Sequence, residues 1–295
     1  MFDPRDDTRD RGEDGRARAY EGRELTGDPR DVLLHDVDLP LNRDREYVLD
    51  RDHVYELNGE DSRTLATVGA FRVVPERDLL DSDDPRAVSE SLDHLRELGL
   101  VETVPIGDYE QGVVLSDRGH DLLESNRRER DPDEDDGQAF HAGVSRVREL
   151  EHDASLYEAY RAEEIRIRDD HPGAEIHRVI LEEDLKREDQ EFLQGHNRDR
   201  PDSDGRPDRN DREIERWALE HDLPYFDDKV HFPDVRIEYE VDGRERHEDV
   251  EVLTPHYRGA HMASRARCGF RCYSSGGSGR SGGRFGIHLA EDMLA

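Results

Sequence analysis

The chain has 295 residues, of which 75 are acidic and 43 are basic, so its formal net charge at pH 7 is −32. This length allows two domains of ordinary size, and 33% hydrophobic residues supply apolar side chains for folded units. No apolar run approaches the ~18 residues of a membrane-spanning helix, and the N-terminal residues lack a hydrophobic signal segment. We therefore expect a cytoplasmic protein without a membrane partner.

Only two of the basic residues are lysines, Lys186 and Lys229. An excess of acid with scarce lysine is typical of a salt-loving cytoplasm, and the alternative is an acidic mesophilic protein from a GC-rich genome. In molar salt the Debye length falls to about 3 Å, so an acidic surface neither unfolds the chain by self-repulsion nor masks a local basic patch. The composition therefore predicts a halophilic protein that can still bind a polyanion.

Several segments have the composition of arms and linkers. Residues 1–30 contain almost no apolar side chains and mix both charges, which predicts a flexible arm. A short apolar patch at 32–34 follows and could pack against the first domain. Residues 129–139 are predicted to form a charged linker, and 256–295 a tail whose Ser/Gly-rich part, 274–283, is flexible.

Residues 53–128 have the order of a winged helix-turn-helix, in which three helices precede a two-stranded ribbon. Apolar residues at helical spacing and the capping residues before each run locate the helices. The predicted elements are a helix from 60–62 to 73–75, a short helix at 75–80, a helix from Arg86 to Leu98, strands at 100–104 and 112–115, and a helix from Ser116.

Residues 140–255 mix helical periodicity with alternation typical of strands, which predicts a second, mixed α/β domain. The chain as a whole is therefore assigned to the α+β class. The predicted elements of the second domain are a long helix at 147–168, a strand at 175–181, helices at 182–193 and 213–221, and a hairpin of 235–241 and 249–252.

The third helix of the first domain is the natural reader of a DNA major groove. Its apolar positions Val88, Leu92 and Leu95 are predicted to face the core. Its solvent face carries both signs of charge, so a role in binding a protein partner stays open as an alternative. The residues predicted to contact DNA are Arg86, Ser89 and Arg96, and the acids that oppose a DNA backbone are Glu90, Asp93 and Glu97.

Residues 252–290 contain no Asp or Glu, although the chain is strongly acidic elsewhere. The same segment holds six arginines interleaved with four aromatic residues. Arginines neutralise phosphates and aromatic rings stack on bases, so this segment is where a polyanion is predicted to dock. The residues predicted to contact double-stranded DNA here are Tyr257, Arg258, Arg265, Arg267 and Arg271.

Asp234, which follows a proline, and Glu251 resemble the acids of PD-(D/E)xK nucleases. In such nucleases two acids on neighbouring strands hold Mg²⁺, and a lysine two residues after the second acid activates or orients the attacking water. Glu149 or Glu151 could add a helix-borne carboxylate. The lysine position is Leu253, and arginine is a poor base because it stays protonated. The pattern therefore favours a structural version of the site without a metal.

Two other arrangements are weaker. Cys268 and Cys272 with His256 and His261 offer zinc-ligand types, but the C-x3-C spacing differs from the usual C-x2-C. Two cysteines are also too few for a disulfide framework. His152 and the aspartate after it lack an accompanying nucleophile, and the chain has no phosphate-binding glycine loop or HExxH motif. We predict neither a zinc site nor catalysis at His152.

Four passages resemble the replication-relaxation family, whose members are carried by plasmids and integrated mobile elements. The resemblance spans residues 53 to about 275, and it implies a DNA-binding winged helix joined to a restriction-endonuclease-like domain. The passages are SRTLATVGAFRVV (62–74), VVLSDRGHDLLE (113–124), FHAGVSRVRELEHD (140–153), and FPDVRIEYE (232–240) with HEDVEVLTPHYRGAH (247–261).

These observations leave three functions to distinguish. The first is a non-catalytic DNA-binding protein that acts in replication or mobilisation of an element. The second is a Mg²⁺-dependent endonuclease that uses Asp234, Glu251 and a helix acid such as Glu151. The third is an adaptor whose winged helix binds a replication or relaxase protein.

Overall fold

The computed structural model describes residues 28–107, 110–129, 137–144, 149–195, 209–253, 267–274 and 288–289. Within these ranges the chain is α+β and contains four small sheets. In the same parts of the chain, no helix has the length and apolarity that crossing a membrane requires.

The N-terminal elements surround one buried helix, α2. A capping box between Asn58 and Asp61 begins this helix, and nearly all of its residues are buried. A Cβ atom on Gly59 would lie 2.1 Å from the carbonyl oxygen of Leu41, so only glycine allows the chain to pass this close. The elements are η1 (Pro29–Leu34), β1 (Glu46–Asp50), β2 (His53–Leu57), α2 (Gly59–Phe71), β3 (Val73–Pro75), α3 (Glu76–Leu80), α4 (Pro85–Glu97), β4 (Val101–Ile106), β5 (Glu110–Leu115) and α5 (Asp117–Ser125).

Helix α4 lies where the sequence predicts the third helix, and its apolar face is buried as expected. Val88, Leu92 and Leu95 are each at most 1% exposed. The side chain of Asp84 accepts a hydrogen bond from the backbone at the start of the helix, and Gly99 takes a positive φ of 70° after its end. Strands β4 and β5 then pair antiparallel, and β3 joins them in the order β3-β5-β4.

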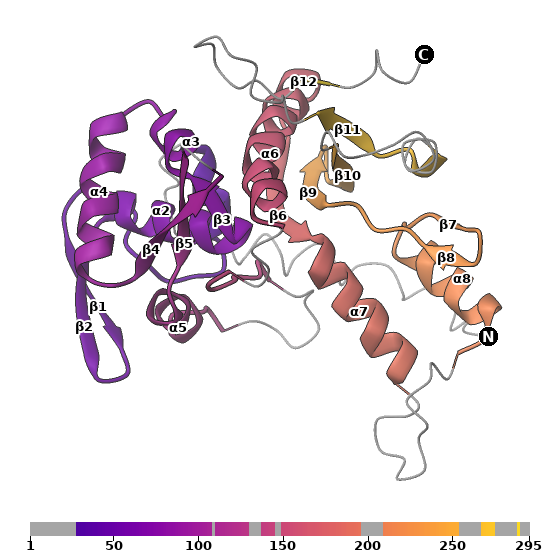
Figure 1. The fold of residues 1–295 in the computed structure, drawn as a ribbon, viewed down its shortest axis with the longest axis horizontal. Helices are drawn as coiled ribbons and strands as arrows, with labels where there is room; N and C mark the ends of the chain where they lie inside the picture. The colour runs from indigo at the N-terminus through magenta and orange to yellow at the C-terminus, as the bar shows by residue number, and fades with distance from the viewer. Residues whose placement is uncertain are drawn as a thin grey trace, which may run out of the picture.

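The C-terminal elements form a five-stranded sheet in the order β12-β11-β10-β9-β6. Strands β10 and β11 are parallel and the other neighbours are antiparallel. Figure 1 shows α6 between this sheet and the N-terminal elements. The elements are α6 (Leu150–Asp170), β6 (Glu175–Leu181), α7 (Glu182–Gln194), α8 (Asp211–Glu220), β7 (Tyr225–Phe226), β8 (Lys229–Val230), β9 (Val235–Val241), β10 (Arg244–Leu253), β11 (Arg271–Ser274) and β12 (His288–Leu289).

One hydrophobic core continues across both sets of elements. The ring of Phe71 at the end of α2 lies 5.1 Å from that of Tyr157 and 5.0 Å from that of Tyr160, both on α6. The amide side chain of Gln138 donates to and accepts from the backbone of Val179 in β6, at 2.9 and 3.0 Å. The segment after residue 136 therefore binds the edge of the second sheet.

Several strands, among them β1, β2 and β11, lie where the sequence analysis expects none. The hairpin of β1 and β2 has no counterpart among the predicted elements, because its outward residues mix charged and apolar side chains and hide the alternation. Strand β11 lies within the segment predicted to be a tail. Its Cys272 and Tyr273 are buried, and it pairs with Val250–Leu253 of β10. The part of the tail at 271–274 is thus sheet.

Candidate functional site

Asp234 and Glu251 lie on neighbouring strands, as a two-carboxylate site requires. Asp234 immediately precedes β9, and the next residue, Val235, pairs with Val250 of β10. The Oδ2 atom of Asp234 accepts a hydrogen bond of 2.7 Å from the backbone N–H of Val252. Asp234 is 6% exposed and Glu251 is fully buried. The fold therefore brings together two acids that are 17 positions apart in the sequence.

A histidine from α6 joins this pair of acids. The Nε2 atom of His152 lies 3.2 Å from Asp234 Oδ2, and its Nδ1 atom lies 3.5 Å from Asp153 Oδ1. Burial alone would lower the pKa of His152, but hydrogen bonds to Asp153 and Asp234 raise the pKa to about 10. The ring is therefore an imidazolium at neutral pH, and it compensates the charge of Asp234.

The helix acid predicted to join the cluster points elsewhere. The side chain of Glu151 is exposed, and its Oε1 atom lies 3.3 Å from the position of a Cβ atom on Gly107, in the turn after β4. The expectation that Glu151 completes a carboxylate cluster is therefore not met, because a change of one residue on α6 turns the side chain to another face. Leu253, at the lysine position, is buried.

This arrangement limits the chemistry of the site. Mg²⁺ prefers oxygen ligands and an open coordination sphere. One oxygen of Asp234 already accepts from both a backbone N–H and the His152 imidazolium. A metal would have to displace the imidazolium from a buried position. Sequence reasoning considered His152 only with its neighbour and missed the contact with Asp234, which lies 82 residues away.

The residues predicted to contact DNA from α4 divide into two groups. Arg86 and Ser89 are exposed near the start of the helix. Arg96 instead turns toward its own domain: its Nη2 atom lies 2.5 Å from Glu76 Oε2, and its Nε atom donates to Thr103 Oγ1 at 3.0 Å. An acid of α3 therefore pairs with this guanidinium, and a DNA contact of Arg96 stays a prediction that would require it to leave Glu76.

The rest of the α4 surface is acidic. Glu90, Asp93 and Glu97 are all exposed and lie at helical spacing on the same side as Arg86. A phosphate backbone along the whole face would meet three carboxylates and one exposed arginine, Arg86. At the N-terminal turn of α4 the helix dipole adds positive potential beside Arg86, but Asp83 and Asp84 are exposed there and Asp84 already accepts a hydrogen bond from the Ala87 N–H.

Two of the predicted tail contacts lie in the described chain. Arg267 is exposed; its Nη1 atom lies 3.1 Å from Asp227 Oδ2, and its guanidinium lies 4.1 Å from the centre of the Phe226 ring. The ring of His231 also stacks on the Phe226 ring, with 3.8 Å between the two ring centres. Arg271 lies on β11 and is half-buried. Cation and ring therefore form a small stack at the surface.

Other predicted residues lie outside the described part of the chain. These are Tyr257, Arg258 and Arg265 of the predicted DNA contacts, and His256 and His261 of the zinc alternative. Of the two cysteines, Cys272 is buried in β11 and contacts the carbonyl oxygen of Phe270 at 3.5 Å.

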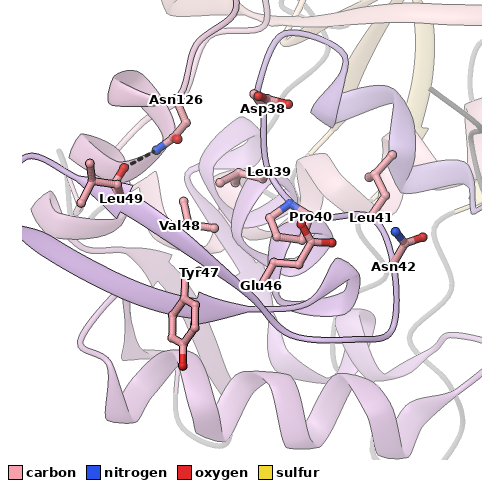
Figure 2. Close-up of a pocket in the computed structure, with 10 residues that line it drawn as sticks. All are labelled: Asp38, Leu39, Pro40, Leu41, Asn42, Glu46, Tyr47, Val48, Leu49 and Asn126. Atoms are coloured by element: carbon pink, nitrogen blue, oxygen red, sulfur yellow. Dashed lines mark hydrogen bonds between the residues drawn. The ribbon is translucent and has the colours of Figure 1, made fainter. Parts of the chain in front are cut away.

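An open groove lies beside β1, away from the carboxylate pair. Residues 38–42 form one wall, residues 46–49 the other, and Asn126 closes one end with a hydrogen bond of 3.3 Å to the carbonyl oxygen of Leu49 (Figure 2). Asp38 and Glu46 make the rim acidic. Among the residues that the structure describes, no histidine, cysteine, lysine or arginine lines the groove.

No protein-family model matches the chain, and no curated protein or solved structure matches it significantly.

Proposed function

We propose that this chain is a non-catalytic, double-stranded DNA-binding protein that acts in replication or mobilisation of a plasmid or integrated element. The observation that carries the proposal is the arrangement of α2, α3 and α4 against the β3-β5-β4 sheet. Three helices followed by a β4–β5 ribbon is how a winged helix-turn-helix is built. The assignment to a mobile element rests on the resemblance to the replication-relaxation family alone.

The docking that best fits the charges uses the start of α4. Helix-turn-helix proteins contact bases with the N-terminal residues of the recognition helix. Arg86 and Ser89 are exposed at that end, and their contacts with DNA would have to outweigh repulsion from the exposed carboxylates of Asp83 and Asp84. The acids further along α4 would point away from a duplex that meets the helix end-on. Tail arginines such as Arg267 would add phosphate contacts.

The second set of elements supports a restriction-endonuclease-like fold without catalysis. Helix α6, the meander of β6, β9 and β10, and the parallel strand β11 follow the order expected of such a domain. The acid pair is present, but His152 compensates Asp234 and Leu253 replaces the lysine. This supports a retained scaffold whose former metal position is taken by an imidazolium.

The experiment is a salt titration of duplex binding by fluorescence anisotropy, run where circular dichroism shows a folded chain. A phosphate-binding protein loses affinity linearly in log–log form as salt rises. Arg86→Gln should reduce the slope by about one, whereas Arg187→Gln on α7 removes the same charge and should leave the slope unchanged. Equal effects of both variants, or no binding by the folded wild type, would refute the proposal.

Two alternatives have specific support. The neighbouring positions of Asp234 and Glu251 favour a metal-dependent nuclease, with Mg²⁺ held by both acids. The exposed acids of α4 favour an adaptor that binds a basic replication or relaxase protein. Divalent-dependent DNA cleavage would establish the first, and binding of a basic protein without duplex binding would favour the second.

A further inference from the structure

The outer face of the second sheet carries charged side chains in rows, each row made of residues that lie side by side on β6, β9 and β10. The odd positions of β9 face the core, so Arg236, Glu238 and Glu240 project from the opposite face. Arg236 binds Asp249 of β10 through two hydrogen bonds of 2.7 and 2.9 Å. Glu238 accepts from Arg178 of β6 at 2.9 Å. In these two rows each acid has an arginine.

The third row brings like charges into direct register. Glu240 pairs with Glu175 of β6 on one side and with Glu245 of β10 on the other. Side chains directly opposite on antiparallel strands have Cβ atoms about 5 Å apart, and like charges at that spacing destabilise the sheet. Among the described residues, no hydrogen-bond donor or cation is found on the half-buried carboxylate of Glu240.

A β-bulge adds a histidine to this row. The register between β6 and β9 shifts between Ile176 and Arg178, which places His177 in the bulge. A bulge re-aims a side chain, and here it turns His177 toward the same face as Arg178. One ligand atom each of His177, Glu240 and Glu245 lies within 4.8 Å of the other two.

We propose that His177, Glu240 and Glu245 form a binding site for a divalent transition-metal ion, with Zn²⁺ as the best match. Imidazole suits zinc rather than Mg²⁺ or Ca²⁺, and zinc also takes carboxylate oxygens at about 2.0–2.2 Å. Ligand atoms around tetrahedral zinc are about 3.4 Å apart, so side-chain shifts of about an ångström close the site. Three protein ligands leave a fourth position for water.

This site is separate from the carboxylate pair already described. Glu240 lies six positions along β9 from Asp234, which corresponds to about 20 Å at 3.3 Å per residue. None of its three ligands belongs to the pair or to the DNA contacts. A metal there would add positive charge beside Glu240 and would tie β6, β9 and β10 together.

The test is isothermal titration calorimetry of the full chain with ZnCl₂ in molar NaCl, where exposed carboxylates bind ions weakly. We expect one zinc ion per chain, and an increase in melting temperature on zinc addition. His177→Gln and Glu240→Gln should each weaken binding at least about 10-fold. Circular dichroism establishes that each variant is folded.

Glu175→Gln is the matched control. It removes the same charge from the same row without removing a ligand, so zinc affinity should change less than about 2-fold. Equal losses in Glu175→Gln and Glu240→Gln would show a general acidic attraction and overturn the site. MgCl₂ binding as tight as that of ZnCl₂, or no zinc binding by the folded wild type, would also overturn it.

Discussion

Arg96 in α4 and Arg267, which precedes β11, both form ion pairs with acidic side chains. The two pairs differ in solvent exposure. The side chains of Arg96 and Glu76 are 27% and 32% exposed, and Arg96 has a further hydrogen bond to Thr103. The side chains of Arg267 and Asp227 are 58% and 70% exposed. Because exposed pairs contribute little, Arg267 can exchange its carboxylate for a phosphate at a smaller cost than Arg96, which would also lose its hydrogen bond to Thr103.

The pair of His152 and Asp234 is a third ion pair and the most buried of the three, since the Asp234 side chain is only 7% exposed. In a chain with 75 acidic residues, what an arginine or histidine can bind depends on which acid it pairs with and on how deeply that ion pair is buried. A count of arginines on a helix or in a segment does not decide it. Variants that change one partner at a time test whether the burial of an ion pair sets its effect on stability and binding.

The largest expected effect comes from the buried face of α4. Leu92 is fully buried, so Leu92→Ala should lower the free energy of unfolding by about 2–5 kcal/mol. Arg96→Ala removes a half-exposed pair and should cost no more than about 1 kcal/mol. Thermal or denaturant unfolding measures both. The reverse order of effects would mean that the arginine side of α4 is the packed one.

The sequence predicts the helices of 53–128 and the β4–β5 ribbon closely because their signals are local. The spacing of Val88, Leu92 and Leu95 specifies which face of α4 is buried, and the aspartate cap and Gly99 specify its ends. The β1–β2 hairpin escaped prediction because its exposed face carries Tyr47, which is 81% exposed, beside charged residues. The alternation of buried and exposed side chains along these two strands is therefore seen in the structure and not in the residue types.

The partners of the charged residues could not be predicted in the same way. Arg96 meets Glu76 only because α3 and α4 pack together, and His152 meets Asp234 only because α6 lies on the sheet. A sequence window shows neither contact. It did identify Asp234 and Glu251 as a pair, because a known motif relates acids on adjacent strands. The motif does not include the histidine.

An intermediate effect is expected from the His152 imidazolium. Its raised pKa means that the contact stabilises the folded state fully below the unfolded pKa near 6.5, and that this contribution is lost as pH rises toward about 10. His152→Gln should therefore cost about 1.5–3 kcal/mol at pH 6 and little at pH 10.5. Unfolding curves across that range measure the difference. A constant cost at every pH would show that His152 acts by packing alone.

A smaller effect on stability but a clear effect on binding is expected at Arg267. Arg267→Gln should change the free energy of unfolding by less than about 0.5 kcal/mol and reduce the slope of log affinity against log salt by about one. Arg96→Gln is the control, because its guanidinium is held by Glu76. If Arg96→Gln changed the slope and Arg267→Gln did not, the link between exposure of a pair and its availability to phosphate would fail.

The smallest expected effect is at the carboxylate pair, where we predict no DNA cleavage at all. Asp234 is occupied by the Val252 N–H and the His152 imidazolium, and Leu253 can neither activate nor orient a water molecule. Supercoiled and linear DNA should stay intact with Mg²⁺ or Mn²⁺. The assay belongs in high salt, because a chain of charge −32 can unfold in dilute buffer through self-repulsion.

His152→Gln gives this prediction a stricter form. The variant removes the competing cation and leaves both acids in place, so it is the protein in which a metal would bind most readily. Continued absence of cleavage would assign inactivity to the missing lysine as well as to the imidazolium. Cleavage by the wild type that disappears in Asp234→Ala or Glu251→Ala would show that a metal displaces His152, and the nuclease alternative would then replace the proposed function.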